Sequence, residues 1–158
     1  MRFLAHIFKR YQPKIGLSGR LHILIVNKET GEVLRDEWND NKIIDAGLNL
    51  VRDLIAGGNT PVSDIAVGTN STAPLATDTT LITEVFRSNI ARRIPTDKKI
   101  TIQNFIPTGS ANGNTLREAG IFNAPNAGDM LSRVTFSDIV KTSAISVTLT
   151  WAITLSEA

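Results

Sequence analysis

Hydrophobic and polar residues alternate along the final stretch of the chain, Ser143 to Leu155. Single Ser, Thr or Ala residues separate six apolar positions, which are Ile145, Val147, Leu149, Trp151, Ile153 and Leu155. Because successive side chains of a strand point to opposite faces, the pattern predicts one long β-strand with an apolar face. Such a strand needs neighbours beside it and a second layer beneath it, so we expect the rest of the chain to be organised around it.

Shorter stretches that predict strands precede this one. Arg20 to Trp38 predicts a hairpin, with Gly31 at a turn position that requires a positive φ. Val62 to Val67 predicts a short strand, and Leu116 to Phe122 and Met130 to Ser137 predict a pair. Many short strands separated by turn residues are typical of an antiparallel sandwich.

A third pair of strands is predicted on either side of a proline-containing turn, at Ser88 to Ile94 and Lys98 to Ile106. In the second of these strands Phe105 is out of phase with the alternation of Ile100 and Ile102. An extra residue in one strand shifts the side chains that follow it to the other face, so we expect a β-bulge just before Phe105.

One stretch, Lys42 to Ala56, has a helical period instead. Leu48, Val51 and Ile55 fall on one stripe, and two glycines follow the last of them. Asp45 is a residue type that caps helix N-termini. We therefore expect a helix that covers one end of the sheet with its apolar stripe.

The first 19 residues predict an arm, because Pro13, Gly16 and Gly19 interrupt any regular pattern there. Its apolar residues lie at helical spacing opposite basic ones, and they are Phe3, Leu4, Ile7 and Phe8. Three interpretations stay open. The arm packs on its own domain or on a neighbouring subunit, which we favour, or it is a disordered tail, or it is a short membrane-surface helix.

These patterns together predict a mainly β fold. We expect an antiparallel β-sandwich, jelly-roll-like, with one α-helix near residues 45–56 and an extended N-terminal arm. The arm would comprise residues 1–19, and a single domain would comprise residues 20–158. Trp151 should lie in the core, between the sheet and the apolar stripe of the helix.

Composition narrows the possible chemistry. The 158-residue chain contains no cysteine, which excludes disulfides, thiolate metal sites and a cysteine nucleophile. Its two histidines, His6 and His22, come with no ligand or triad pattern, so we expect no metal and no cofactor. No apolar run approaches the ~18 residues of a membrane span, so we expect neither a membrane segment nor an export signal.

Four charged residues in apolar surroundings are the candidates for a polar site: Glu84, Arg87, Arg117 and Glu118. Paired carboxylates serve glycoside hydrolysis, but the chain has only two Trp and one Tyr to line a glycan cleft. We therefore expect a buried ion-pair network that joins Arg87 and Glu118, and no enzymatic activity.

The net charge of +2 is too small to attract nucleic acid to the whole molecule. A basic cluster between Arg87 and Lys99 has no interleaved aromatic residues. We therefore expect it to face solvent or another subunit rather than nucleic acid.

Three segments in order carry a family resemblance. Ile65 to Thr69 is followed by Glu84 to Arg87, Leu116 to Phe122 is followed by Gly128 to Leu131, and a Thr-rich strand follows Lys141. This succession resembles the N-terminal domain of tail-collar fibre proteins of tailed bacteriophages, which attaches the fibre to the baseplate. The resemblance implies that Gly68 makes a tight turn, that Arg87 and Glu118 are internal fixtures, and that Gly120 allows close packing. It implies no catalytic residue.

From this resemblance we expect a non-enzymatic structural protein of a tailed-phage virion, synthesised in the host cytoplasm. It would be a tail, baseplate or fibre-attachment adaptor subunit that binds other virion proteins and forms a homo-oligomer. Fibre proteins continue into a long shaft, whereas this sequence ends at Ala158, which favours an adaptor. The alternative is a capsid decoration (cement) protein. A carbohydrate-binding or carbohydrate-cleaving module that uses Glu84 and Glu118 is a remote alternative.

Overall fold

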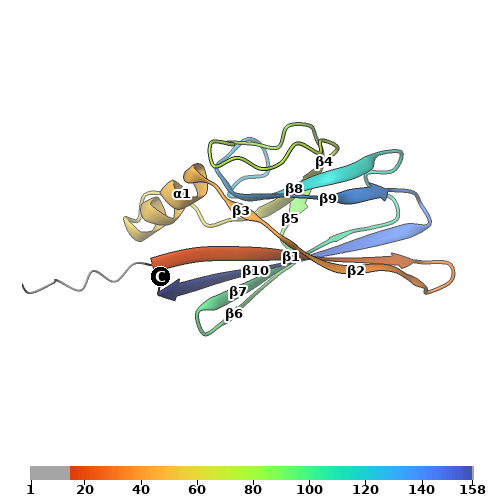
Figure 1. The fold of residues 1–158 in the computed structure, drawn as a ribbon, viewed down its shortest axis with the longest axis horizontal. Helices are drawn as coiled ribbons and strands as arrows, with labels where there is room; N and C mark the ends of the chain where they lie inside the picture. The colour runs from red at the N-terminus through yellow and green to blue at the C-terminus, as the bar shows by residue number, and fades with distance from the viewer. Residues whose placement is uncertain (1–14, 158) are drawn as a thin grey trace, which may run out of the picture.

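The computed structural model describes residues 15–157, which form two antiparallel β-sheets and one short helix (Figure 1). The first sheet has five strands: β2 (Val33–Asp40), β1 (Ile15–Asn27), β10 (Ile145–Glu157), β7 (Lys99–Ile106) and β6 (Arg92–Thr96), in that order. The central strand is β10, and it pairs with β1 along its whole length, from Ile145 opposite Asn27 to Glu157 opposite Ile15. The prediction of a long final strand with neighbours on both sides is confirmed.

The second sheet also has five strands: β3 (Lys42–Ile43), β9 (Met130–Val140), β8 (Thr115–Phe122), β4 (Asp64–Gly68) and β5 (Glu84–Asn89), in that order. Three antiparallel pairs are nested along the chain, because β1 pairs with β10, β3 with β9 and β4 with β8. Along the chain, each of these pairs therefore encloses the next. The predicted mainly β fold with a single helix is confirmed.

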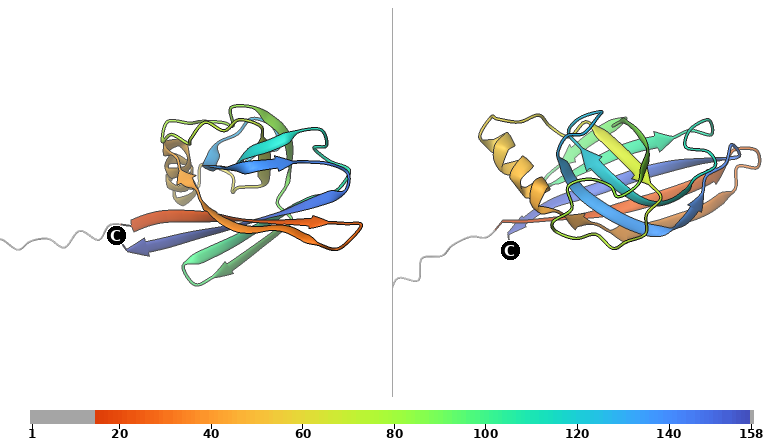
Figure 2. Two further views of the ribbon diagram at one scale, coloured as in Figure 1. Left: turned by 45° about the vertical axis from the view of Figure 1, so that its right-hand side comes forward. Right: turned by 90° about the horizontal axis from the view of Figure 1, so that it is seen from above.

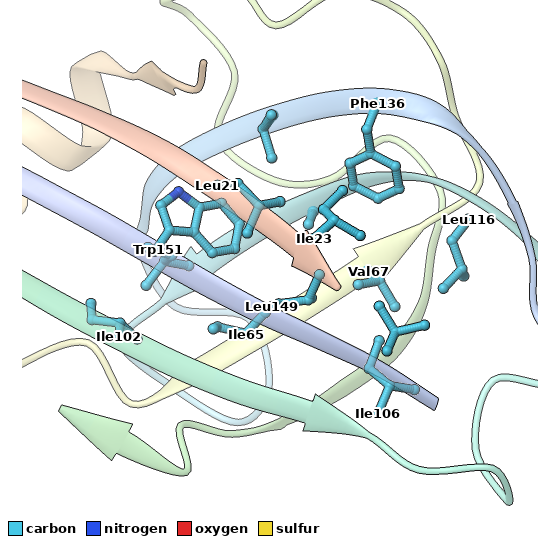
Figure 3. Packing of buried hydrophobic residues seen from close by; sticks show 14 of the residues in the cluster. Leu21, Ile23, Ile65, Val67, Ile102, Ile106, Leu116, Phe136, Leu149 and Trp151 are labelled. Atoms are coloured by element: carbon cyan, nitrogen blue, oxygen red, sulfur yellow. The ribbon is translucent and has the colours of Figure 1, made fainter. Parts of the chain in front are cut away.

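The two sheets face each other across a common core (Figure 3). Trp151, Leu21 and Ile23 from the first sheet and Ile65 and Val67 from the second are each at most 1% exposed. Every second residue of β10 from Thr148 to Thr154 lies on the opposite face and is half-buried, so the two-residue period of the sequence decides which side chains enter the core there. Full burial of an aliphatic or aromatic side chain stabilises the folded state by about 1.5–3 kcal/mol.

The helix α1 (Asp45–Ile55) lies at the end of the molecule where β1 begins and β10 ends (Figures 1 and 2). Its range agrees with the predicted one, but its N-cap residue is Ile44, which makes no side-chain capping bond. The prediction that Asp45 caps the helix is therefore wrong. Asp45 lies in the first turn instead, where its carboxylate interacts favourably with the helix dipole.

The face of α1 that is buried differs from the predicted apolar stripe. Leu50 is 1% exposed and Gly47 is buried, whereas Leu48 and Ile55 are 51% and 84% exposed. A Cβ atom at Gly47 would overlap the carbonyl oxygen of Leu131, so the missing side chain lets α1 approach β9 on that side. Trp151 is fully buried as predicted, but the helix stripe expected to cover it points largely outward.

The boundary between arm and domain lies earlier than predicted. Residues 15–19, assigned to the arm, are the first residues of β1 and pair with β10. A Cβ atom at Gly19 would overlap the Asn41 side chain, so this glycine marks a close approach within the sheet rather than a break. The rest of the arm, with Phe3, Leu4, Ile7 and Phe8, lies outside the described residues.

The predicted bulge before Phe105 is absent, because β7 pairs with β10 in continuous register over its described length. Phe105 points to the outer face and is 43% exposed. The inward position beside it belongs to Asn104, whose amide donates to Ser88 Oγ at 2.9 Å. The apolar alternation of β7 is therefore interrupted because a hydrogen-bonded polar residue, Asn104, takes an inward position, and not because a residue is inserted.

The loop of residues 69–83 lies over the outer face of the second sheet (Figures 1 and 2). Beneath it a second small core forms from Ile44, Ala66, Leu81, Phe122 and Met130. Strand β4 is consequently buried on both faces, with every residue buried. The outer face of the first sheet is half-exposed along β1, β10 and β7.

Candidate functional site

A fully buried arginine anchors the loop of residues 69–83 to the second sheet. Arg133 of β9 is 0% exposed, and its guanidinium lies 2.8 Å from Glu118 Oε2 and 2.9 Å from Asp78 Oδ2. It also donates to the carbonyl oxygen of Thr72 at 3.0 Å. A buried charge is tolerated only when it is paired and its hydrogen-bonding groups are satisfied, and both conditions hold here.

Glu118 of β8 holds the returning end of the same loop. Its two carboxylate oxygens accept hydrogen bonds from the backbone N–H groups of Ile82 and Thr83, at 3.2 and 2.8 Å. Glu118 is itself 0% exposed and lies against Gly68. The Arg133–Glu118–Asp78 cluster (hereafter the charged cluster) therefore fixes the loop near both of its ends.

Arg87 of β5 forms a separate pair with Glu84 of the same strand, at 2.6 Å. It also donates to the carbonyl oxygens of Ala124 and Ala127 at 2.8 and 2.9 Å, and its guanidinium lies 3.7 Å from the Phe122 ring centroid. Arg87 thus fastens the connection between β8 and β9 to the outer face of the sheet.

Arg117 pairs with Asp138 at 2.7 Å near the far end of β8 and β9. The hydrogen bond from Arg117 holds the pKa of Asp138 below its ordinary value, and partial desolvation opposes this shift. Arg117 also donates to the carbonyl oxygen of Thr69, so this more exposed pair supports the start of the same loop.

The predicted direct link between Arg87 and Glu118 is wrong. Both side chains lie on the outer face of the second sheet, but Arg87 pairs with Glu84 and Glu118 pairs with Arg133. The sequence analysis missed Arg133, whose position within the apolar pattern of Met130 to Ser137 was the available signal. Glu118 lies under the loop with its oxygens occupied, so it cannot contact a glycan.

The two glycines singled out by the family resemblance are both sites of close approach. A Cβ atom at Gly68 would overlap the carbonyl oxygen of Thr83 and the Glu118 side chain. Gly68 has no positive φ and lies at a register shift at the end of β4. It therefore allows Thr83 and Glu118 to pack closely against the backbone rather than forming a tight turn. A Cβ atom at Gly120 would lie 2.8 Å from Met130 Sδ, in agreement with the implied close packing.

Lys141 is a second enclosed cation, and its contacts are all neutral. It is 0% exposed, and its ammonium donates to Asn112 Oδ1 at 2.9 Å and to the carbonyl oxygens of Thr142 and Thr108 at 3.0 and 3.4 Å. Burial lowers the pKa of this ammonium below its ordinary value. Lys141 ties the polar loop between β7 and β8 to the start of the β9–β10 connection.

His22 lies on the outer face of the first sheet. Its Nε2 atom is 2.6 Å from Asp36 Oδ1, and its ring packs 4.9 Å from that of Trp38. The Arg20 guanidinium lies 5.4 Å from the same indole. His22 is therefore a hydrogen-bonded residue of the outer face rather than a residue of the core.

An apolar hollow on the described surface lies beside α1. It has a volume of about 350 Å³, and its apolar lining consists of Ile15, Leu17, Leu48, Val51, Ile55 and Leu155. These residues form what we call the end groove. Four of the six side chains are more than 40% exposed, which is a large apolar surface to leave in water for a domain of this size.

Within residues 15–157 no group of three or more His, Asp or Glu side chains is placed to bind a metal ion. No helix in that range has the length and apolar character needed to cross a membrane. Comparison with protein-family models, curated proteins and solved structures found no match to this chain.

Proposed function

We propose that the protein is a non-enzymatic structural subunit of a tailed-phage virion. It acts as a tail, baseplate or fibre-attachment adaptor that binds other virion proteins and forms a homo-oligomer. The proposal rests on the ordered resemblance of three segments to the attachment domain of tail-collar fibre proteins. Two of these segments include the central strands β4 and β8, and the third includes β10.

The end groove is the observation that carries an assembly role. It gathers exposed apolar side chains from β1, β10 and α1 at one pole of the molecule. Contiguous exposed apolar surface in a soluble protein marks an interaction site. The charged residues, by contrast, are occupied in holding loops, so they serve the fold rather than a reaction.

We further propose that the sandwich-like architecture is jelly-roll-like, with residues 1–14 as an extended arm. The nested pairing of β1 with β10, β3 with β9 and β4 with β8 supports this, since a jelly roll is a long hairpin rolled into two layers. Ile15, the first described residue of β1, lines the end groove.

Locating the protein in purified particles tests the proposed function. We expect quantitative mass spectrometry to find it in intact virions, and gold labelling to place it at the tail or baseplate. A copy number equal to one small ring supports the adaptor. A copy number near that of the major capsid protein supports the alternative, a capsid decoration protein. Absence from particles purified through a density gradient contradicts both.

Deleting residues 1–14 tests whether the arm serves assembly. The deletion leaves β1 complete, so we expect the melting temperature of the isolated domain to stay nearly unchanged while incorporation into particles is lost. If the truncated protein unfolds, the arm belongs to its own core. If it is incorporated at full occupancy, the arm is dispensable.

A further inference from the structure

The end groove exists because α1 has two apolar faces and only one of them is buried. Leu50 and Gly47 pack toward the sheets, which leaves Leu48, Val51 and Ile55 along the opposite stripe. Leu48 and Ile55 are two helical turns apart on the same side. Together with Leu17 and Leu155 from the strand ends, they give the end groove an elongated apolar lining.

The chain itself carries a segment of matching character, 14 residues long, directly before the groove. Phe3, Leu4, Ile7 and Phe8 recur at the spacing of an amphipathic helix. Apolar anchors at this spacing are the recognised way in which a helix binds an apolar groove. Basic residues flank these positions, at Arg2, Lys9 and Arg10, so the apolar stripe is the surface of this segment that suits the groove.

The short distance along the chain between the segment and the groove favours binding to the groove of a second copy over binding to the groove of the same molecule. β1 stays paired to its first residue, with Ile15 opposite Glu157, and Ile15 itself lines the groove, so only residues 9–14 separate Phe8 from the edge of the same molecule's groove. A chain that returns to the same molecule's groove has to reverse its direction within these six residues. A second copy needs no reversal.

We propose that the apolar side chains of residues 3–8 of one copy occupy the end groove of a second copy. Each chain offers one such segment and one groove, so exchange links copies in a closed dimer or ring. The inference rests on the proposed assembly function and adds to it the identity of both contacting surfaces.

Disulfide trapping tests which chain fills the groove, because the natural sequence has no cysteine. Full-length chains carrying either Phe8→Cys or Ile55→Cys are made with tags of different mass, mixed and oxidised. Ile55 is 84% exposed, so its substitution leaves the core intact. We expect a disulfide-linked pair that contains one chain of each kind.

Pairing Phe8→Cys with Val140→Cys serves as the matched control. Val140 is 63% exposed and lies on β9 at the opposite pole, so we expect at least a tenfold lower yield of the linked pair. A double variant, Phe8→Cys with Ile55→Cys, should give linked multimers. Closure within single chains of this double variant would overturn the proposal in favour of the same molecule's groove. Equal yields for the two pairings would show that the contact is non-specific and would also overturn it.

A charge placed in the groove gives a second measurement. Ile55→Asp should weaken self-association at least tenfold in sedimentation experiments, with no change in melting temperature. Leu75→Asp, a 58% exposed position in the loop of residues 69–83, should leave association unchanged. Unaltered association of Ile55→Asp would refute the groove as the contact.

The outcomes separate this inference from the proposed function. A protein that exchanges arms in solution but is absent from virions leaves the inference standing and removes the virion role. A virion protein that is incorporated at full occupancy as Ile55→Asp removes the inference alone.

Discussion

The two buried cations, Arg133 and Lys141, have different kinds of hydrogen-bond partner, and this difference determines how each contributes to stability. Arg133 has two carboxylate partners, Glu118 and Asp78, and a backbone carbonyl. Lys141 has only neutral oxygens, from Asn112, Thr108 and Thr142. The arginine is thus part of a paired cluster that holds the loop of residues 69–83, whereas burial lowers the pKa of the lysine and no carboxylate opposes this shift.

Removing the buried arginine should be strongly destabilising. Arg133→Met leaves Glu118 and Asp78 charged without their cation, so we expect a loss of ~3–5 kcal/mol in the free energy of unfolding, measured in urea. Arg92→Met, at an exposed position on β6, should stay within ~0.5 kcal/mol. A double-mutant cycle with Glu118→Gln should give a coupling above ~0.5 kcal/mol, and strictly additive effects would show that the pair does not act as a unit.

Lys141 predicts an alkaline dependence of stability. Its pKa is lowered in the folded state from an ordinary value of 10.5, so below that pH the unfolded chain binds more protons than the folded one. Stability therefore rises with pH in the window just below 10.5 and is lowest where both states are protonated. The free energy of unfolding, measured in urea across pH 7–10.5, should show this rise with pH for the natural chain and should lack it for Lys141→Met. Parallel curves for the two proteins would contradict the assignment.

At the level of elements, the sequence predicted which segments are strands better than it predicted how they pack. Strict alternation marked β10, because one of its faces lies against the core, and apolar runs bounded by turn residues marked β8 and β9. The orientation of α1 was not predictable in the same way, since its apolar residues cover more than one stripe. Gly47 determines which face of α1 packs against the sheets, because only a residue without a side chain fits against the backbone of β9 there. This requirement leaves no periodic pattern in the sequence.

Gly47 can be tested against the usual preference of helices. Alanine at an exposed helical position is favoured over glycine by about 1 kcal/mol, yet a Cβ atom at Gly47 would overlap the Leu131 carbonyl oxygen. We therefore expect Gly47→Ala to lower the melting temperature measured by calorimetry. Gly109→Ala, where a Cβ atom meets nothing within 4 Å, should be neutral or slightly stabilising. A stabilised Gly47→Ala protein would mean that α1 does not pack closely on β9.

At the scale of the whole molecule, strand order is the property that the sequence concealed. The hairpins β1–β2, β6–β7 and β8–β9 join neighbours in sequence and follow from turn residues. The pairing of β1 with β10 joins the two ends of the described chain, and no local pattern encodes it. The charged cluster was hidden for the same reason, because Asp78, Glu118 and Arg133 come from distant segments.

Trp151 connects these distant parts, so its removal should affect the whole fold. It is 0% exposed in the core shared by both sheets (Figure 3). Trp151→Ala should lower the free energy of unfolding by ~3–5 kcal/mol, with near-UV and far-UV circular dichroism melting together. The other tryptophan is the control, since Trp38 is 47% exposed and Trp38→Ala should cost far less. A loss below ~1 kcal/mol for Trp151→Ala would show that β10 is peripheral.

The side-by-side position of Ile15 and Glu157 makes the molecule mechanically anisotropic (Figure 1). A force that pulls these two ends apart opens the β1–β10 pairs one after another from Ile15 inward, as a zipper opens, so the resistance at any moment is that of a single pair. A force between Glu157 at this pole and the turn at Thr30 runs along the strands and loads all thirteen pairs of β1 with β10 in shear together. A particle that transmits tension through this subunit would hold it at opposite poles, and a neighbour that grips both ends at one pole could peel it open.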